Sequence, residues 1–490
     1  MSACLPFRSA TELVAALGRG ETSSSELLEL YIERYERFNP QLNAIVDTDL
    51  EGARARARQA DQAREKGESL GALHGLPMTL KDSIEIRGMR TTHGSPTFKD
   101  YRSVRDADVV ESLQGAGAVI FGKTNLPLFG NDFQTFNEVY GTTNNPWNLE
   151  LSPGGSSGGA AAAVAAGLTG LEIGSDIGGS IRSPAHYCGV YGHKPSFGIV
   201  PYFGQLPPSK HHVHDHMVPL DLVVTGPLGR SAEDLAMVMD LVVRPARGDR
   251  KAFRIELPPA RKKSLKDYRI GVWIDDGDYG PDSSVGDALQ HAVDALARAG
   301  AQVVDKRPDL DFRRCYQVYS ELLNLATAHT LPEDQFKQLQ ELTRQPDADQ
   351  EHPIVKYAHM KTRTHGEWLR LNGQRAMMRT RWEEYFQDVD VMICPCARVA
   401  AFPHDPRSFT KRVNTVNGQE LPHDEVLLPW AGLTLMAYLP ATSAPVGLTP
   451  DGRPVGAQIV GPYHEDRTPI HVAQLMQDVV GGYTPPPGYE

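Results

Sequence analysis

The stretch SPGGSSGGAAAAVAAG, residues 152–167, and the segment LTGLEIGSDIGG after it, residues 168–179, decide the fold. The alanine run predicts a helix, and the apolar segment after it predicts a buried strand that ends in a glycine turn. The same texture recurs in LHGLPMTLKDSI, residues 73–84, and in GAVIFGKTN, residues 117–125, with the helical DADVVESLQGAG between them. Because buried strands alternate with helices, we predict an α/β architecture with a mostly buried sheet.

The flanking regions extend this prediction in both directions. Residues 22–66 and residues of about 310–388 have helical patterns, whereas residues 248–266 are rich in proline and charge, as in a linker. Strand patterns return in VDVMICPCA, residues 389–397, and in TLMAYLPATSAPVGL, residues 434–448. We therefore expect one sheet that the chain revisits, within a single domain spanning residues 1–490.

Composition excludes several classes of protein. The net charge of −11 argues against a large nucleic-acid footprint, and five scattered cysteines do not suggest a disulfide framework. The sequence contains no run of about 18 apolar residues, the length that a membrane span needs, and the N-terminus lacks the pattern of a secretion signal. We expect a soluble cytoplasmic protein that binds neither membrane nor nucleic acid, with a homodimer as one possible assembly.

Two glycine motifs imitate other sites. Gly117–Thr124 matches the phosphate-loop pattern, but its four central residues form an apolar strand and Pro127 stands where the helix should run. Gly154–Gly158 matches the G-x-S-x-G nucleophile elbow, but an asparagine- and proline-rich loop precedes it in place of a strand. A Ser-His-Asp enzyme therefore remains open but has little support.

The tract HHVHDH, His211–His216, resembles a metal-binding sequence. It lacks the residue that a dinuclear hydrolase places between the last His–Asp pair, so a polar surface loop is the preferred interpretation. A binding protein or metal-dependent protein that uses this tract is the least favoured alternative. We expect no metal and no cofactor.

Three other segments make chemical sense together. They carry Lys81 at the end of an apolar strand, Ser156 within the glycines, and Ser180 in GSDIGGSIRSPA. The two serines lie 24 positions apart (180 − 156 = 24), with a helix and a strand between them, so the chain can return beside its start. A buried lysine can lose its proton and act as a base toward a serine hydroxyl.

These motifs resemble the amidase signature family of serine hydrolases. The similarity rests on GLPMTLKD, GKTN, GTTNNP, SPGGSSGGAAAAVAAG, SDIGGSIRSPAHYCGVYGHKP and GPLGRSAEDLA, and it returns more weakly in PVGLTPDGRPVGAQIVGP. It implies a large mixed, mostly buried central β-sheet covered by helices on both faces. It also implies a signature core over about 70–240, a variable helical, polar region over about 250–390 that covers the substrate side, and C-terminal strands over 391–490 that rejoin the sheet.

The resemblance also implies roles for the three residues. Ser180 corresponds to the nucleophile, Lys81 to the general base, and Ser156 to a bridging serine that follows a cis peptide bond from Gly155. A hydroxyl is both donor and acceptor, so Ser156 can relay a proton between the other two. Asp176 and Arg182 flank the nucleophile, and we expect them to pair and brace its loop.

The turn before the nucleophile implies an anion site. By the same resemblance, the backbone N–H groups of Ile177, Gly178, Gly179 and Ser180 form the oxyanion hole for a tetrahedral intermediate. The substrate pocket is expected to include residues from LPLFGNDFQTFNEVYG and its neighbours: Phe129, Asn131, Phe133 and Gly155.

The expected function is hydrolysis of a small-molecule amide, with an aryl amide, ester or carbamate also accessible to such a nucleophile. The alternative is a glutamine-hydrolysing subunit of a tRNA-dependent amidotransferase, because some family members have that role with the same three residues. Nothing in the motifs separates these two functions.

Overall fold

The computed structural model describes residues 5–205, 220–345, 349 and 352–490. Its centre is an eight-stranded sheet with the strand order β10-β9-β11-β15-β14-β7-β8-β6. Strand β9 pairs in parallel with β10 and with β11, whereas the other pairs are antiparallel. The strands are β6 (Glu172–Asp176), β7 (Tyr191–Lys194), β8 (Val224–Gly229), β9 (Arg269–Val272), β10 (Gln302–Val304), β11 (Val391–Pro395), β14 (Ala441–Leu448) and β15 (Pro454–Val460).

Late strands do rejoin the sheet, which confirms the expectation of a large mixed sheet. Strand β15 pairs with β11 and β14, and β14 in turn pairs with β7 from the glycine-rich half of the chain. The sheet is mixed because the β9 neighbours are joined through helical crossovers, which permit parallel pairing.

The early strands form a separate three-stranded sheet, in the order β1-β3-β2. These strands are β1 (Ile45–Thr48), β2 (Pro77–Lys81) and β3 (Val119–Thr124). A hydrogen bond from the Thr79 N–H to the Leu171 carbonyl, 3.3 Å long, joins β2 to the segment just before β6. The expectation of a single sheet was therefore wrong for these strands, although the two sheets lie side by side.

The helical patterns of residues 22–66 form two helices, but the strand between them was not predicted. Helix α2 (Ser24–Leu42) ends at Asn43, which adopts the left-handed conformation, and α3 (Leu50–Glu65) begins after β1. Between them, Ile45–Thr48 pairs antiparallel with β3, so tertiary pairing overrides the local helical pattern.

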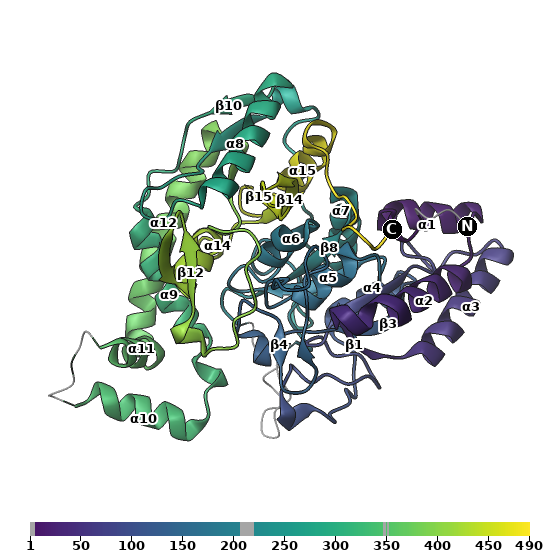
Figure 1. Ribbon diagram of the computed structural model, residues 1–490, viewed down its shortest axis with the longest axis horizontal. Helices are drawn as coiled ribbons and strands as arrows, with labels where there is room; N and C mark the ends of the chain where they lie inside the picture. The colour runs from purple at the N-terminus through teal and green to yellow at the C-terminus, as the bar shows by residue number, and fades with distance from the viewer. Residues whose placement is uncertain (1–4, 206–219, 346–348, 350–351) are drawn as a thin grey trace.

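Helices cover both faces of the large sheet, as predicted (Figure 1). Along β15, Val455, Ala457 and Ile459 join the cluster that contains α8 (Ser283–Arg298) and α15 (Arg467–Val480). The alternate residue Gly456 faces α6 (Arg182–Cys188): a Cβ there would lie 3.2 Å from the His186 Cα. Successive residues of β15 therefore face opposite sides of the sheet, and both sides are covered by helices.

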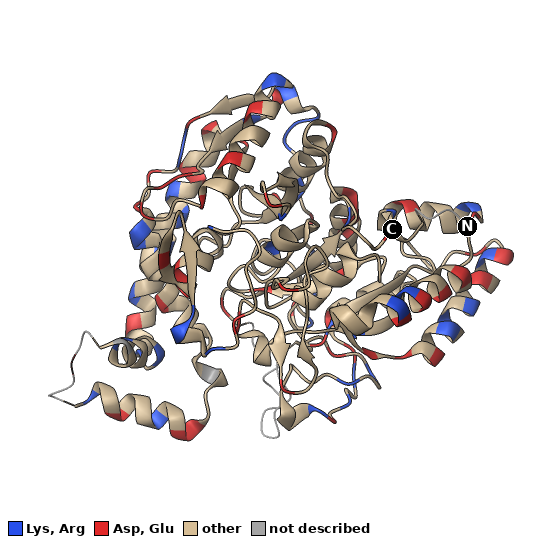
Figure 2. Cartoon of the chain, in the orientation of Figure 1, with Lys and Arg blue, Asp and Glu red and all other residues tan. Residues whose placement is uncertain are grey.

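The region after β10 forms a helical layer at the left of Figure 1, as the sequence predicts. It consists of α9 (Phe312–Ala326), α10 (Glu333–Thr343), α11 (Pro353–Lys361) and α12 (His365–Asp388). Charged residues recur along helices such as α2, α3 and α10 (Figure 2), whereas α9 packs against the buried α14 (Pro429–Met436).

Five further α-helices and two hairpins belong to the described part of the chain. The helices are α1 (Ala10–Arg19), α4 (Asp108–Gly115), α5 (Gly158–Ala165), α7 (Ala232–Val242) and α13 (His423–Leu427). Two hairpins pair β4 (Phe136–Asn137) with β5 (Gly141–Thr142), and β12 (Val413–Val416) with β13 (Gln419–Pro422). Among the described helices, none combines the length and the apolar character needed to cross a lipid bilayer.

Candidate active site

Lys81 lies at the centre of a cluster of hydroxyl groups. It is the last residue of β2, and its side chain is only 1% exposed. Its Nζ donates to Ser156 Oγ at 2.7 Å, to Ser157 Oγ at 3.0 Å and to Ser175 Oγ at 3.0 Å. The structure therefore brings the predicted base into direct contact with the predicted relay serine.

The electrostatics of this cluster bring the pKa of the Lys81 amine close to neutral pH. Burial lowers the pKa of Lys81 to about 7, although the charge of Asp176, and that of Glu172 when it is ionised, opposes the shift. Burial also raises the pKa of Glu172 to about 8, so this carboxyl is mostly uncharged near neutral pH. A lysine with a pKa of about 7 can accept a proton under physiological conditions, as a general base must.

The turn that carries Ser156 is crowded by backbone. The peptide bond between Gly155 and Ser156 is cis, the conformation that the family resemblance implied. A Cβ at Gly155 would lie 2.5 Å from the Asp132 carbonyl oxygen, so only glycine fits there. Helix α5 starts two residues after Ser156, and this packing fixes where the hydroxyl can lie.

Ser180 lies in the turn between β6 and α6, and it is 4% exposed. The Ser157 N–H donates to the Ser180 carbonyl at 3.2 Å, which ties this turn to the turn of Ser156. Asp176 and Arg182 form a buried ion pair of 2.9 Å beside it, so the predicted brace is confirmed. All three predicted catalytic residues thus belong to one buried region.

The Asp176 carboxylate also binds the turn itself. Its Oδ1 accepts from the Gly179 N–H at 2.8 Å and its Oδ2 from the Ile181 N–H at 3.1 Å. Although burial alone raises the pKa of this carboxyl, Arg182 brings it below its ordinary value, so it is charged. The Gly179 N–H is therefore already engaged, and the oxyanion-hole hypothesis rests on the amides of Ile177, Gly178 and Ser180.

The four residues expected in the substrate pocket separate into two groups. Gly155 and Phe133 lie at the serine turns: a Cβ on Gly178 would contact the Phe133 ring at 3.5 Å. Phe129 is 37% exposed and Asn131 is exposed as well. Gly130, between these two, is the closer neighbour, since a Cβ there would lie 3.3 Å from Ser156 Oγ.

Two hydroxyl groups at the site were not predicted from the sequence. Ser157 and Ser175 both contact the Lys81 Nζ, and the Ser175 N–H approaches Ser157 Oγ at 3.4 Å. Ser157 is adjacent to Ser156 in the glycine-rich stretch, and Ser175 is adjacent to Asp176 in β6. This adjacency to residues already singled out was the sequence signal that could have identified them. These hydroxyls hydrogen-bond an amine that is otherwise shielded from water.

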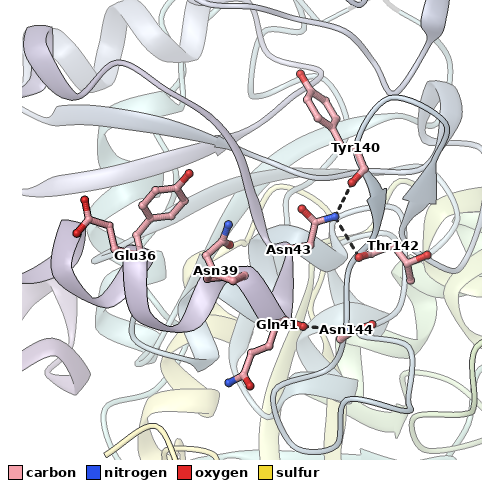
Figure 3. Close-up of a pocket in the computed structure, with 9 residues that line it drawn as sticks. Glu36, Asn39, Gln41, Asn43, Tyr140, Thr142 and Asn144 are labelled. Carbon is pink, nitrogen blue, oxygen red and sulfur yellow. Dashed lines mark hydrogen bonds between the residues drawn. The ribbon is translucent and has the colours of Figure 1, made fainter.

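A hollow of about 430 Å³ lies elsewhere, between the end of α2 and the β4–β5 hairpin (Figure 3). Asn43 Nδ2 bridges its walls by donating to the carbonyls of Tyr140 at 2.6 Å and Thr142 at 3.1 Å. Neither the predicted base nor either predicted serine lines this hollow, so it is not part of the candidate active site.

The metal-binding alternative gains no support from the described residues. The tract His211–His216 lies outside them. Within the ranges that the structure describes, no three His, Cys, Asp or Glu side chains gather as a metal site would require. The four cysteines in those ranges are free and buried, and the sequence had not suggested a disulfide framework.

Comparisons with known proteins agree with this geometry. The chain matches the Amidase family over residues 26–469. It is 33% identical to an acylamidase from Rhodococcus erythropolis, over 97% of this chain and 96% of that protein. It is 30% identical to a glutamyl-tRNA(Gln) amidotransferase subunit from Thermosynechococcus vestitus, over 95% of this chain and 96% of that protein.

A solved structure gives the same result for the fold. A bacterial aryl acylamidase of the amidase signature family superposes with a TM-score of 0.80 and 25% identity, covering 97% of this chain and 96% of that one. The chain therefore belongs to the amidase signature family. It is an amide-hydrolysing enzyme, as the family and its acylamidase relative indicate.

Proposed function

We propose that this enzyme cleaves carboxylic amides through an acyl-enzyme on Ser180, with Lys81 as the base and Ser156 as the relay. The observation that carries the proposal is the contact of 2.7 Å between a buried Lys81 Nζ and Ser156 Oγ, in a turn hydrogen-bonded to that of Ser180. A lysine that is half neutral near pH 7 can start the reaction.

The proton moves in two steps. Ser180 Oγ attacks the carbonyl carbon while its proton passes to Ser156 Oγ, whose own proton passes to Lys81 Nζ. Amide N–H groups of the 177–180 turn stabilise the negative oxygen that results. The carbon–nitrogen bond then breaks and the departing amine takes a proton back by the same route. Water adds to the acyl-enzyme and releases the acid and Ser180.

The proposed substrates are small acyl amides, aryl amides included. Support comes from the acylamidase relative at 33% identity and from the fold shared with an aryl acylamidase. The apolar cluster that contains Phe133 and Ile177 lies beside the serine turns and suits an apolar acyl or aryl group. Esters and carbamates are secondary substrates for the same nucleophile.

A second candidate is a glutaminase subunit of a tRNA-dependent amidotransferase. The observation in its favour is the 30% identity to one amidotransferase subunit over nearly the full length of both proteins. Hydrolysis of glutamine only in the presence of a partner protein would favour this function, whereas turnover of acyl anilides by the isolated chain favours the first.

The test is a substrate screen with the purified chain and its Ser180→Ala variant. The screen compares acyl anilides, aliphatic amides, carbamates and glutamine by release of amine or ammonia. We expect turnover of at least one acyl amide and a loss of about a thousandfold or more in the variant. A variant that retains wild-type turnover on every cleaved substrate contradicts the assignment of Ser180.

A further inference from the structure

A tyrosine from the helical layer contacts the turn of the proposed nucleophile. Tyr319 lies on α9, its side chain is fully buried, and its Oη donates to the Ile177 carbonyl oxygen at 2.7 Å. A Cβ on the next residue, Gly178, would lie 3.5 Å from the same Oη. The proposed proton relay does not use this hydroxyl.

The contact determines the direction of a neighbouring N–H group. In a trans peptide the C=O and N–H point in opposite directions, and the Ile177–Gly178 peptide is trans. By holding the Ile177 carbonyl, Tyr319 therefore directs the Gly178 N–H away from α9. Asp176 holds the Gly179 N–H, so two consecutive peptide groups of the turn are held from two different elements.

We propose that Tyr319 is a positioning residue for amide cleavage, whose hydroxyl aligns and polarises the Ile177–Gly178 peptide so that its N–H stabilises the oxyanion. The inference rests on the proposed function. A hydrogen bond accepted by the carbonyl draws electron density from the amide, which makes its N–H a stronger donor. The oxyanion forms only in the transition state, so the benefit appears in the chemical step.

The ring of Tyr319 is held in place by a notch in α14. A Cβ at Gly432 would lie 2.3 Å from the Tyr319 Cδ1 and 2.6 Å from its Cε1, so the ring fills the space that a side chain would occupy. Burial, with a smaller contribution from Asp176, raises the pKa of Tyr319 well above its ordinary value. The hydroxyl therefore keeps its proton, and its role as donor, throughout the working pH range.

Tyr319→Phe removes the hydroxyl and keeps the ring. We expect kcat on an acyl anilide to fall about fivefold with KM changed by less than twofold. Fivefold corresponds to about 1 kcal/mol, the net contribution of one neutral hydrogen bond. Affinity for a boronic acid, which forms a tetrahedral adduct with serine, should fall by the same factor, whereas a non-covalent amide analogue binds equally well.

The matched control is Tyr385→Phe. Tyr385 is also a buried tyrosine whose Oη donates to a backbone carbonyl, but it lies on α12 and its partner, Lys306 at 3.0 Å, follows β10 and is not part of a serine turn. If the loss of any such hydrogen bond were sufficient, kcat would fall equally in both variants. We expect the control to keep wild-type kcat and boronic acid affinity.

Gly432→Ala supplies a second route to the same answer, because the added methyl displaces the ring while the hydroxyl remains. Gly432→Ala should reproduce the fall in kcat with an unchanged KM. If Tyr319→Phe does not fold, the kcat of Gly432→Ala tests the role of Tyr319 in its place. Wild-type kcat in a folded Tyr319→Phe, or a change confined to KM, overturns the inference. Full activity of Ser180→Ala in the same assay refutes the proposed function instead.

Discussion

Replacing Ser175 with aspartate should keep the proposed base, Lys81, protonated at neutral pH. Ser175 Oγ lies 3.0 Å from the Lys81 Nζ, and the residue is only partly buried, so a slightly larger side chain can be accommodated. The new carboxylate stands next to the amine without an intervening group. An opposite charge at this range raises the pKa of a lysine by about 1–3 units, because it stabilises the protonated form.

The expected loss follows from the fraction of neutral lysine. With a pKa of about 7, about half of Lys81 is neutral at pH 7. A rise of about 2 units leaves roughly 1% neutral, so kcat/KM at pH 7 should fall about 50-fold. The loss should disappear progressively toward pH 10, where Lys81 is neutral in both proteins.

The assay is the pH dependence of kcat/KM from pH 5.5 to 10, which reports the pKa of the free enzyme. The wild type should rise tenfold per pH unit below pH 7 and level off above it. Ser175→Asp should level off near pH 9. Ser175→Asn, which has nearly the same shape without the charge, is the control and should keep the wild-type midpoint.

Two results would refute this reasoning. One is a Ser175→Asp profile whose rising limb coincides with that of the wild type, since Lys81 would then not be the group that titrates. The other is an equal loss of activity at every pH, which would indicate damaged packing and not a protonated base.

Three further predictions concern stability. The pKa of Lys81 is about 7 when folded against its ordinary 10.5, so the unfolded chain binds more protons between these values and stability rises with pH there. Lys81→Met should therefore raise the free energy of unfolding by about 1 kcal/mol or more at pH 7, once the loss of its hydrogen bonds is subtracted, and by less at pH 10. Urea titration at both pH values tests this, and a lower free energy of unfolding for the variant at pH 7 would contradict it. Gly155→Ala would place its methyl 2.5 Å from backbone, so it should lower the free energy of unfolding by about 1–3 kcal/mol in the same titration. An unchanged urea midpoint would contradict the close packing at this turn. Arg182→Met leaves the Asp176 carboxylate buried and unpaired and should cost about 3–5 kcal/mol, whereas Arg313→Met, at an exposed pair, should change the midpoint little.

Local sequence was sufficient for the elements nearest the chemistry. The alanine run forms α5, the apolar segment after it forms β6, and Lys81 ends a buried strand, because each is encoded by propensity and burial within about ten residues. The Asp176–Arg182 pair was predictable for the same reason, since six positions (182 − 176 = 6) separate its members.

The contacts that differ from expectation depend on distant parts of the chain. Strand β1 forms because Ile45–Thr48 finds β3, some 75 residues later, and no local pattern records that pairing. Tyr319 reaches Ile177 across 142 positions, from a helix that carries none of the motifs quoted for the catalytic region. The role of the Gly179 N–H was obscured because the same glycine turn can face either an anion or its own Asp176 carboxylate.

The central claim is that Ser180 carries the acyl group, and mass spectrometry tests it most directly. The active enzyme is treated with a fluorophosphonate, with and without excess substrate, and the labelled peptide is sequenced. We predict a single adduct on Ser180, formed in step with loss of activity and suppressed by substrate. An adduct on another residue that tracks inactivation, or full activity in enzyme labelled at Ser180, would contradict the account.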